Sequence, residues 1–208
     1  MKDKLSLNPW TSIWLKPRET IREIINFNPK HLFFLLAWMY GIPTVLQFFQ
    51  NYSFGAQFPL LWLSAAALIV APLAGFLGII LLSALLFWTG KWMGGKACFT
   101  DLKAAVAWSN VPSVVNIGIW IVLMISFKER LFSATFSEGV FVGYELALVF
   151  FTLLFQVILA VWGFVIWVRM VSEVQQLSIW KALLNIGCAC LILTAAWMVI
   201  TACSIYIN

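Results

Sequence analysis

The feature that most constrains the fold is the stretch from Leu60 to Trp88, which runs for 29 residues without a charge. At about 1.5 Å of rise per helical residue, it is longer than the roughly 30 Å hydrocarbon core of a bilayer. It predicts a membrane-spanning helix that tilts, projects or kinks, with Pro72 as the expected kink site. The chain is 63% hydrophobic and 10% charged, and so few charges cannot cover a soluble domain. We expect an all-α integral membrane protein.

Four further apolar stretches reach the length of about 20 residues that a span requires. The expected five-helix bundle has spans at about 31–50, 60–88, 104–126, 143–168 and 182–206. Neither half of the stretch 60–88 is long enough to cross alone, which argues against a sixth span. Residues 1–30 form a segment of their own ahead of the membrane domain, residues 31–208. This segment has no apolar stretch, so we expect no cleavable signal peptide.

Basic residues are distributed unevenly between the two sides of the expected bundle. Eleven Lys and Arg fall on the side of the N-terminus and two fall on the other side. The positive-inside rule then places the N-terminus in the cytoplasm and the C-terminus on the opposite side. The net charge of +5 therefore sets the orientation, and we expect no nucleic-acid partner.

The segment before the first span predicts an amphipathic interfacial helix. Asn8-Pro9 is a favourable helix start, and Lys16-Pro17 separates a first short helix from a second one. Tryptophans beside basic residues are typical of helices that lie in the membrane interface. Two interpretations stay open: a plain membrane anchor, or a docking surface for a protein partner or for anionic headgroups. The candidate docking residues are Trp10, Trp14, Lys16, Arg18 and Arg22.

The third span contains a cluster of polar residues around a proline. In one continuous helix, three of them form a stripe, and the proline frees the carbonyl of Trp108 from its helical hydrogen bond. This arrangement predicts either a substrate or ion site, as in the broken helices of transporters, or a polar contact between helices. The candidate intramembrane polar site consists of Ser109, Asn110, Pro112, Ser113 and Asn116.

Small residues recur along the second span at steps of three and four. Such a seam lets the backbone of another helix approach closely. We expect it to pack against the Asn110–Asn116 face of the third span. The candidate seam consists of Ser64, Ala67, Ala71, Gly75 and Gly78.

The residue patterns of catalysis and metal binding are missing from the sequence. His31 is the sole histidine, and Cys188 and Cys190 lie in an apolar stretch without a His or acidic neighbour. Glu145 and Arg169 fall at opposite ends of the fourth span, which leaves no carboxylate at mid-depth for ion coupling. We expect no enzymatic activity, no cofactor and no metal site.

Three segments resemble bacterial members of the Yip (Ypt-interacting protein) family. The first runs from Asn8-Pro9-Trp10 to Ile21, the second from Gly94-Gly95-Lys96 to Val111-Pro112, and the third from Glu173-Val174-Gln175 to Trp180-Lys181-Ala182. They stand in the family's order relative to the five spans. The resemblance covers nearly the whole chain and implies a five-span bundle with a cytoplasmic N-terminus.

The eukaryotic relatives act in vesicle traffic between the endoplasmic reticulum and the Golgi, and they bind Rab-type GTPases and each other. The short segment before the first span favours a bacterial plasma (inner) membrane instead. We expect a non-enzymatic polytopic scaffold or adaptor that organises the lipid bilayer or binds other membrane proteins, itself included as a homo-oligomer. The alternative is a small-molecule or lipid transporter or scramblase with a polar intramembrane cleft.

Overall fold

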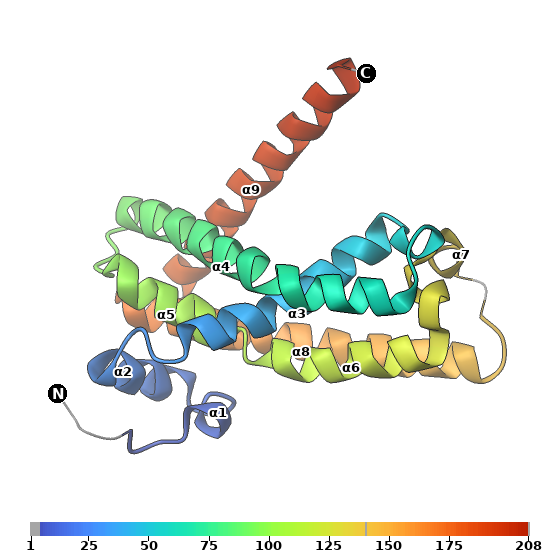
Figure 1. Ribbon diagram of the computed structural model, residues 1–208. Coiled ribbons are helices and arrows are strands. Elements are labelled where there is room, and N and C mark those ends of the chain that lie inside the picture. The colour runs from blue at the N-terminus through green and yellow to red at the C-terminus, as the bar shows by residue number, and fades with distance from the viewer. Residues whose placement is uncertain (1–4, 140, 208) are drawn as a thin grey trace. The chain divides into compact units, whose positions relative to one another are not determined.

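The computed structural model describes residues 5–139 and 141–207, and all regular secondary structure in these residues is helical (Figure 1). Within these residues, five helical stretches are long and apolar enough to cross a membrane. This confirms the expected all-α, five-span class. Lys2 and Lys4, which contribute to the predicted positive charge of the N-terminus, lie outside the described residues. The stretches are α3 (Phe33–Asn51), α4 (Leu60–Trp92), α5 (Phe99–Ser109) with α6 (Pro112–Phe127), α8 (Tyr144–Gln175) and α9 (Ile179–Ile207).

Short helices make up the N-terminal segment and the loops. They are α1 (Pro9–Ser12), α2 (Pro17–Phe27), α7 (Ala134–Ser137) and the 3-10 turns η1 (Phe54–Ala56) and η2 (Lys128–Phe132). The N-terminal pair begins where the sequence predicts. The Asn8 side chain accepts a hydrogen bond from the Trp10 N–H at 3.1 Å, as an N-cap does. Lys16, at φ −128° and ψ 55°, separates the two helices ahead of Pro17.

The chain divides into two compact units, each assembled from separate parts of the sequence. Unit 1 comprises Met1–Pro29, Ile80–Val106 and Ile166–Asn208, and unit 2 comprises Lys30–Ile79 and Ala107–Val165. Unit 1 therefore contains α1, α2, the end of α4, most of α5, the end of α8, and α9. Unit 2 contains α3, η1, the first part of α4, the end of α5, α6, η2, α7 and the first part of α8.

Two glycines bring α3 and α4 into backbone contact in unit 2. A Cβ on Gly75 would lie 1.8 Å from the carbonyl oxygen of Ala37, and one on Gly41 would lie 1.9 Å from that of Ala71. Gly78 faces the ring of Tyr40. The close partner of Ala71, Gly75 and Gly78 is therefore the first span, and the expectation that they pack against the Asn110–Asn116 face is wrong. The sequence could not distinguish the two because a small-residue seam accepts any neighbouring backbone.

The other end of the seam joins the main apolar core of unit 2. The Ser64 hydroxyl donates to the Leu60 carbonyl of the same helix and lies 4.0 Å from the sulfur of Met124 on α6. Ala67 is buried in the same core. The remaining buried members of this core are Val45, Leu46, Leu63, Ile119, Trp120, Leu123, Phe127, Leu131 and Phe132.

Helix α4 continues through Pro72 as a single helix. Because proline has no N–H, the carbonyl four residues earlier, that of Leu68, loses its helical partner. The indole N–H of Trp38 on α3 donates to this carbonyl at 3.1 Å. A neighbouring span thus supplies the hydrogen bond that the proline removes, as the absence of water in the hydrocarbon core requires.

The loops at one end of unit 2 are joined by polar contacts. Gln50 donates from Nε2 to the Leu131 carbonyl at 3.2 Å, and a Cβ on Gly55 would lie 2.4 Å from the Glu129 carbonyl. Arg130 forms a two-oxygen ion pair with Glu145 at 3.0 Å. Glu145 lies in the first turn of α8, where the helix dipole also favours a carboxylate.

Gly75→Ala is expected to lower the free energy of unfolding by roughly 2 kcal/mol, because the added methyl group must separate α3 from α4. The matched control is Gly118→Ala on α6, where a Cβ would meet nothing within 4 Å. The control is expected to keep or slightly raise stability, since alanine is the better helix former. Unfolding in mixed detergent micelles, followed by circular dichroism, measures both variants. Equal stabilities would contradict the backbone contact.

Candidate functional site

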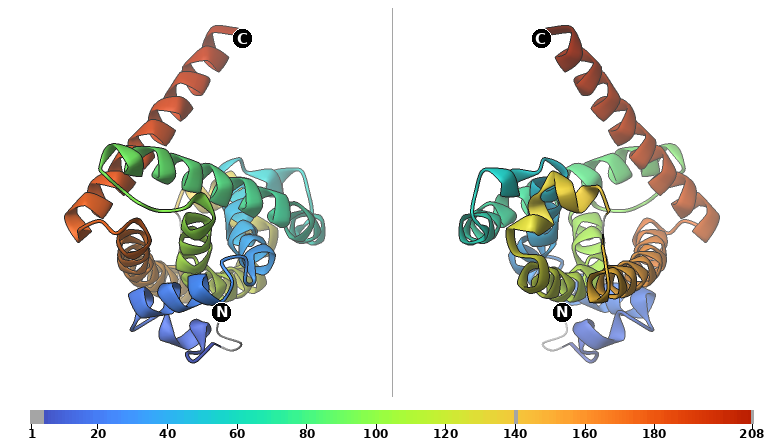
Figure 2. Two further views of the ribbon diagram at one scale, coloured as in Figure 1. Left: turned by 90° about the vertical axis from the view of Figure 1, so that its left-hand side faces the viewer. Right: turned by 90° about the vertical axis from the view of Figure 1, so that its right-hand side faces the viewer.

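Helix α2 is attached to the C-terminal end of α8 by two arginines. Arg18 donates from Nη2 to the Ser172 hydroxyl at 2.9 Å. Arg22 donates from Nε and Nη2 to a single carboxylate oxygen of Glu173, at 2.9 and 2.5 Å. Figures 1 and 2 both show α2 beside this end of α8. Charge-assisted hydrogen bonds of this kind fix orientation as well as adding energy.

The apolar face of the N-terminal segment is covered by the protein itself. Ile13, Ile21 and Ile24 have no exposed surface, and the Thr20 hydroxyl, also buried, donates to Ser12 at 2.9 Å. These isoleucines are the side chains that an interfacial anchor would insert into lipid. Their burial therefore favours an N-terminal segment that packs as part of the folded protein and does not insert these side chains into lipid.

The five predicted docking residues have different surroundings. Arg18 and Arg22 bind α8, whereas Lys16 forms a largely exposed pair with Glu19 at 3.6 Å. Trp14 is half-buried, and its indole N–H donates to the Trp10 carbonyl at 3.0 Å. The outer face of this segment thus presents exposed charges and parts of two tryptophans.

A buried polar network lies at the α8–α9 corner of unit 1, which we define as residues 172–185. Gln175, 1% exposed, donates from Nε2 to the Leu86 carbonyl on α4 at 2.9 Å, and its own carbonyl accepts from the Lys96 N–H at 3.1 Å. Asn185, with no exposed surface, donates to the same Leu86 carbonyl at 3.3 Å and accepts from the Thr89 hydroxyl at 2.5 Å. Buried amides are tolerated only when paired in this way.

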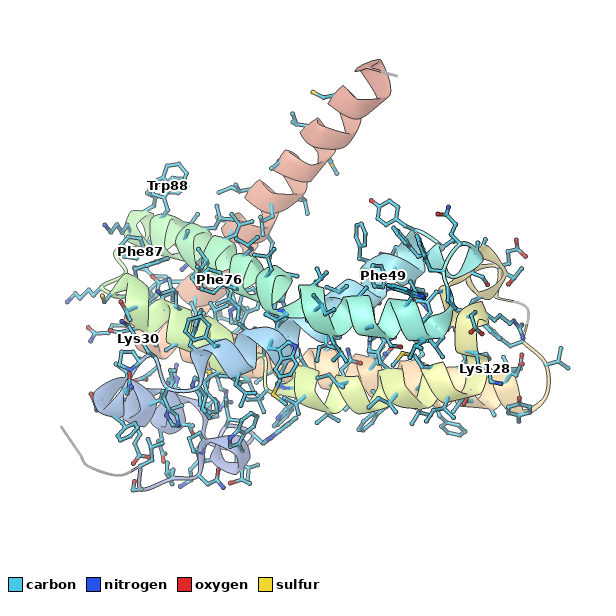
Figure 3. The ribbon with its side chains drawn as sticks, viewed as in Figure 1. Lys30, Phe49, Phe76, Phe87, Trp88 and Lys128 are labelled. Atoms are coloured by element: carbon cyan, nitrogen blue, oxygen red, sulfur yellow. The ribbon has the colours of Figure 1, made fainter. Side chains whose placement is uncertain are left out.

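Glycines at the end of α4 make room for this network. A Cβ on Gly90 or Gly95 would lie within 2.1 Å of the Gln175 side-chain oxygen. Gly94, at φ +83°, ends the helix, and the Gly95 N–H returns to the Gly90 carbonyl at 2.8 Å. This is a Schellman motif, whose left-handed residue is normally glycine. Trp88, on the same turn of α4, points away from the ribbon (Figure 3) and is 58% exposed.

The polar cluster of the third span is interrupted, because α5 and α6 are separate helices. The Val111 N–H donates to the Trp108 carbonyl at 3.2 Å, and the Ser113 N–H donates to the Asn110 carbonyl at 2.8 Å. These tighter bonds close the gap at Pro112, so the expected free carbonyl of Trp108 is wrong. Ser109 belongs to α5, whereas Ser113 and Asn116 belong to α6, and the three do not form one helical stripe.

Three of the five predicted polar residues line a cleft of about 330 Å³ in unit 2. Pro112, Ser113 and Asn116 face Gln47 of α3 and Gln156 of α8 across it. Gln156 donates from Nε2 to Asn116 Oδ1 at 3.1 Å. Ser109 and Asn110 are not among the lining residues. The cleft walls carry amides and a hydroxyl, which can bind a ligand but supply no nucleophile–base pair.

Within residues 5–139 and 141–207, no group of three His, Cys, Asp or Glu side chains could share a metal ion. His31 stacks on Trp108 with ring centroids 6.2 Å apart. Cys188 and Cys190 are unbridged.

Sequence analysis did not identify the roles of Gln175, Asn185 and Thr89. The available signal was the two amide side chains flanking the start of the last span, together with three glycines just after the second. Amides that close to a span are costly unless they pair. Their partners come from different spans, and no spacing in the sequence identifies them.

The five long apolar helical stretches define a multi-pass integral membrane protein. The Yip1 domain family model matches residues 11–200. The chain therefore belongs to the Yip1 family. No curated protein sequence and no solved structure matches it.

Gly90→Ala is expected to destabilise the protein by about 1–3 kcal/mol, because the methyl group expels the Gln175 amide from its carbonyl partner and leaves a buried polar group unpaired. The double variant Gly90→Ala/Gln175→Ala should recover part of this loss, since it removes both the amide and the clash. Thermal unfolding in detergent measures both. A double variant less stable than Gly90→Ala would contradict this arrangement.

Proposed function

We propose that this Yip1-family protein is a non-enzymatic scaffold or adaptor that binds other membrane proteins through its N-terminal segment. The observation that carries the proposal is the attachment of α2 to α8 by Arg18–Ser172 and Arg22–Glu173. A segment held in this way offers a fixed surface, and a pre-organised surface binds with little loss of conformational freedom.

The charges and aromatic residues left on the outer face support a protein partner. Lys16 and Glu19 are about 60% exposed on their side chains, and Leu15 is 80% exposed. An apolar residue among solvated charges is typical of the edge of a binding surface. The same surface can serve a second copy of the chain, which makes a homo-oligomer one form of this function.

The asymmetry of basic residues supports the placement of this surface. Eleven Lys and Arg fall on the side of the N-terminus and two on the opposite side, which favours an N-terminus in the cytoplasm. We place the protein in a bacterial inner membrane with the α2 surface on the cytoplasmic side. The partner then is a protein that carries its contact region on that side of the membrane.

The polar cleft of unit 2 favours a second function, transport or scrambling of a lipid or small molecule. Asn116 and Gln156 lie on spans α6 and α8, where polar groups mark substrate pathways in transporters. A flux assay in proteoliposomes distinguishes the two functions: flux that is lost in Asn116→Ala/Gln156→Ala supports transport, whereas a scaffold gives no protein-dependent flux.

The charge reversal Arg22→Glu is expected to lower recovery of the partner about threefold, the effect of removing a partly exposed ion pair that positions α2. Crosslinking in native membranes followed by co-purification and quantitative mass spectrometry measures the recovery. The double reversal Arg22→Glu/Glu173→Arg should restore it.

The matched control exchanges the charges of an ion pair in unit 2, Arg130→Glu/Glu145→Arg, which leaves both α2 and its outer face unchanged and should leave recovery of the partner unchanged. A partner recovered at equal yield with Arg22→Glu and with the native chain would contradict the proposal. So would the absence of any near-stoichiometric partner.

A further inference from the structure

The cleft of unit 2 continues into a row of polar side chains along the end of α3. Gln47, which lines the cleft, donates from Nε2 to Gln50 at 3.1 Å and to Asn51 at 2.9 Å. Gln50 in turn donates to the Leu131 carbonyl in the loop region. Hydrogen-bonding groups therefore extend from the Asn116–Gln156 pair to the end of the first span.

The cleft reaches the middle of the expected membrane. Asn116 precedes the end of α6 by eleven residues, and Gln156 follows the start of α8 by twelve. At about 1.5 Å per residue, both lie roughly 16–18 Å from those helix ends, close to the midplane of a core of about 30 Å. Polar groups at this depth are costly and typically mark a binding site or pathway.

The lining defines the chemistry of the ligand. Asn116 and Gln156 offer amide donors and acceptors, and Ser113 offers a hydroxyl. Gln47 offers its amide oxygen, because both of its N–H groups donate within α3. None of the seven lining residues is charged. A phosphate or ammonium group buried here would lack a counter-charge and pay its full desolvation cost. Hydroxyl and ester groups, in contrast, find both donors and acceptors.

The surroundings of the cleft favour a lipid as the source of these groups. Beside Gln47 and Gln156 on their helices stand exposed apolar side chains, Phe48, Val157 and Ile158, each about half exposed. Acyl chains need such apolar surface next to the polar head. The volume of about 330 Å³ falls at the lower end of the range typical of ligand sites.

We propose that this cleft binds the uncharged head of a neutral glycerolipid such as diacylglycerol. The free hydroxyl and the ester carbonyls occupy the amide-lined cleft, and the acyl chains lie along the apolar surface of α3 and α8. This site is independent of the proposed scaffold function, because it lies in unit 2 and uses none of the α2 contacts.

The test uses the full chain in phosphatidylcholine nanodiscs with a diacylglycerol that carries a photoactivatable group on one acyl chain. Labelled peptides are mapped by mass spectrometry. Labelling is expected in residues 44–51 of α3 and 153–160 of α8 in the native chain, where the acyl chains lie. Asn116→Leu/Gln156→Leu removes both members of the amide pair, so that neither is left unpaired, and should reduce labelling about fivefold or more.

A second variant, Ala160→Trp, fills the cleft without removing any polar group and should reduce labelling equally, which covers the case in which the leucine variant does not fold. The matched control is Thr152→Val, one turn before Gln156 on α8. The Thr152 hydroxyl donates to the Leu148 carbonyl of the same helix. This control should label like the native chain.

Competition identifies the ligand class. Unlabelled diacylglycerol should displace the probe, whereas phosphatidic acid and free glycerol should not. Displacement by phosphatidic acid would overturn the assignment to an uncharged head, and displacement by glycerol would overturn the assignment to a lipid. Labelling that is equal in all variants would overturn the site.

Discussion

The structure depends on one constraint: a backbone or amide group in the hydrocarbon core has no water to bond, so each irregularity needs a partner from the protein. Pro72 removes the partner of the Leu68 carbonyl, and Trp38 of another span replaces it. At Pro112, tighter backbone bonds take the Trp108 carbonyl. At the end of α4, the Leu86 carbonyl accepts from both Gln175 and Asn185. The hydrogen bonds to the Leu68 and Leu86 carbonyls also join different helices.

The α8–α9 corner shows how this constraint connects to function. The three segments that carry the family resemblance are far apart in sequence, yet all contribute to unit 1. Arg18 and Arg22 of the first bind Ser172 and Glu173, and Gly95 of the second makes room for Gln175 of the third. Residues of these segments thus hold the N-terminal segment in place. The proposal that the protein is a scaffold rests on this attachment of the N-terminal segment.

Features that depend on length and local spacing could be predicted from the sequence. Five spans follow from apolar stretches such as Leu60–Trp88, and the starts of α1 and α2 follow from Asn8 and from Lys16-Pro17, because these signals act within one or two turns. The partner of Gly75 and the burial of Ile21 and Ile24 did not follow, because both are set by contacts between distant segments. The cleft was found only in part: Ser113 and Asn116 were identified, whereas Gln47 belongs to a span that gave no local signal of a site.

Hydrogen exchange of the α2 amides tests the central claim most directly, namely that α2 is a built part of the fold and not a lipid-bound anchor. The protein is placed in nanodiscs of neutral lipid and, separately, of anionic lipid, and the peptides covering residues 17–27 are followed by mass spectrometry. The account predicts slow exchange that is the same in both, because Arg18, Arg22 and the buried isoleucines bind the protein. Fast exchange in neutral lipid that slows in anionic lipid would contradict it.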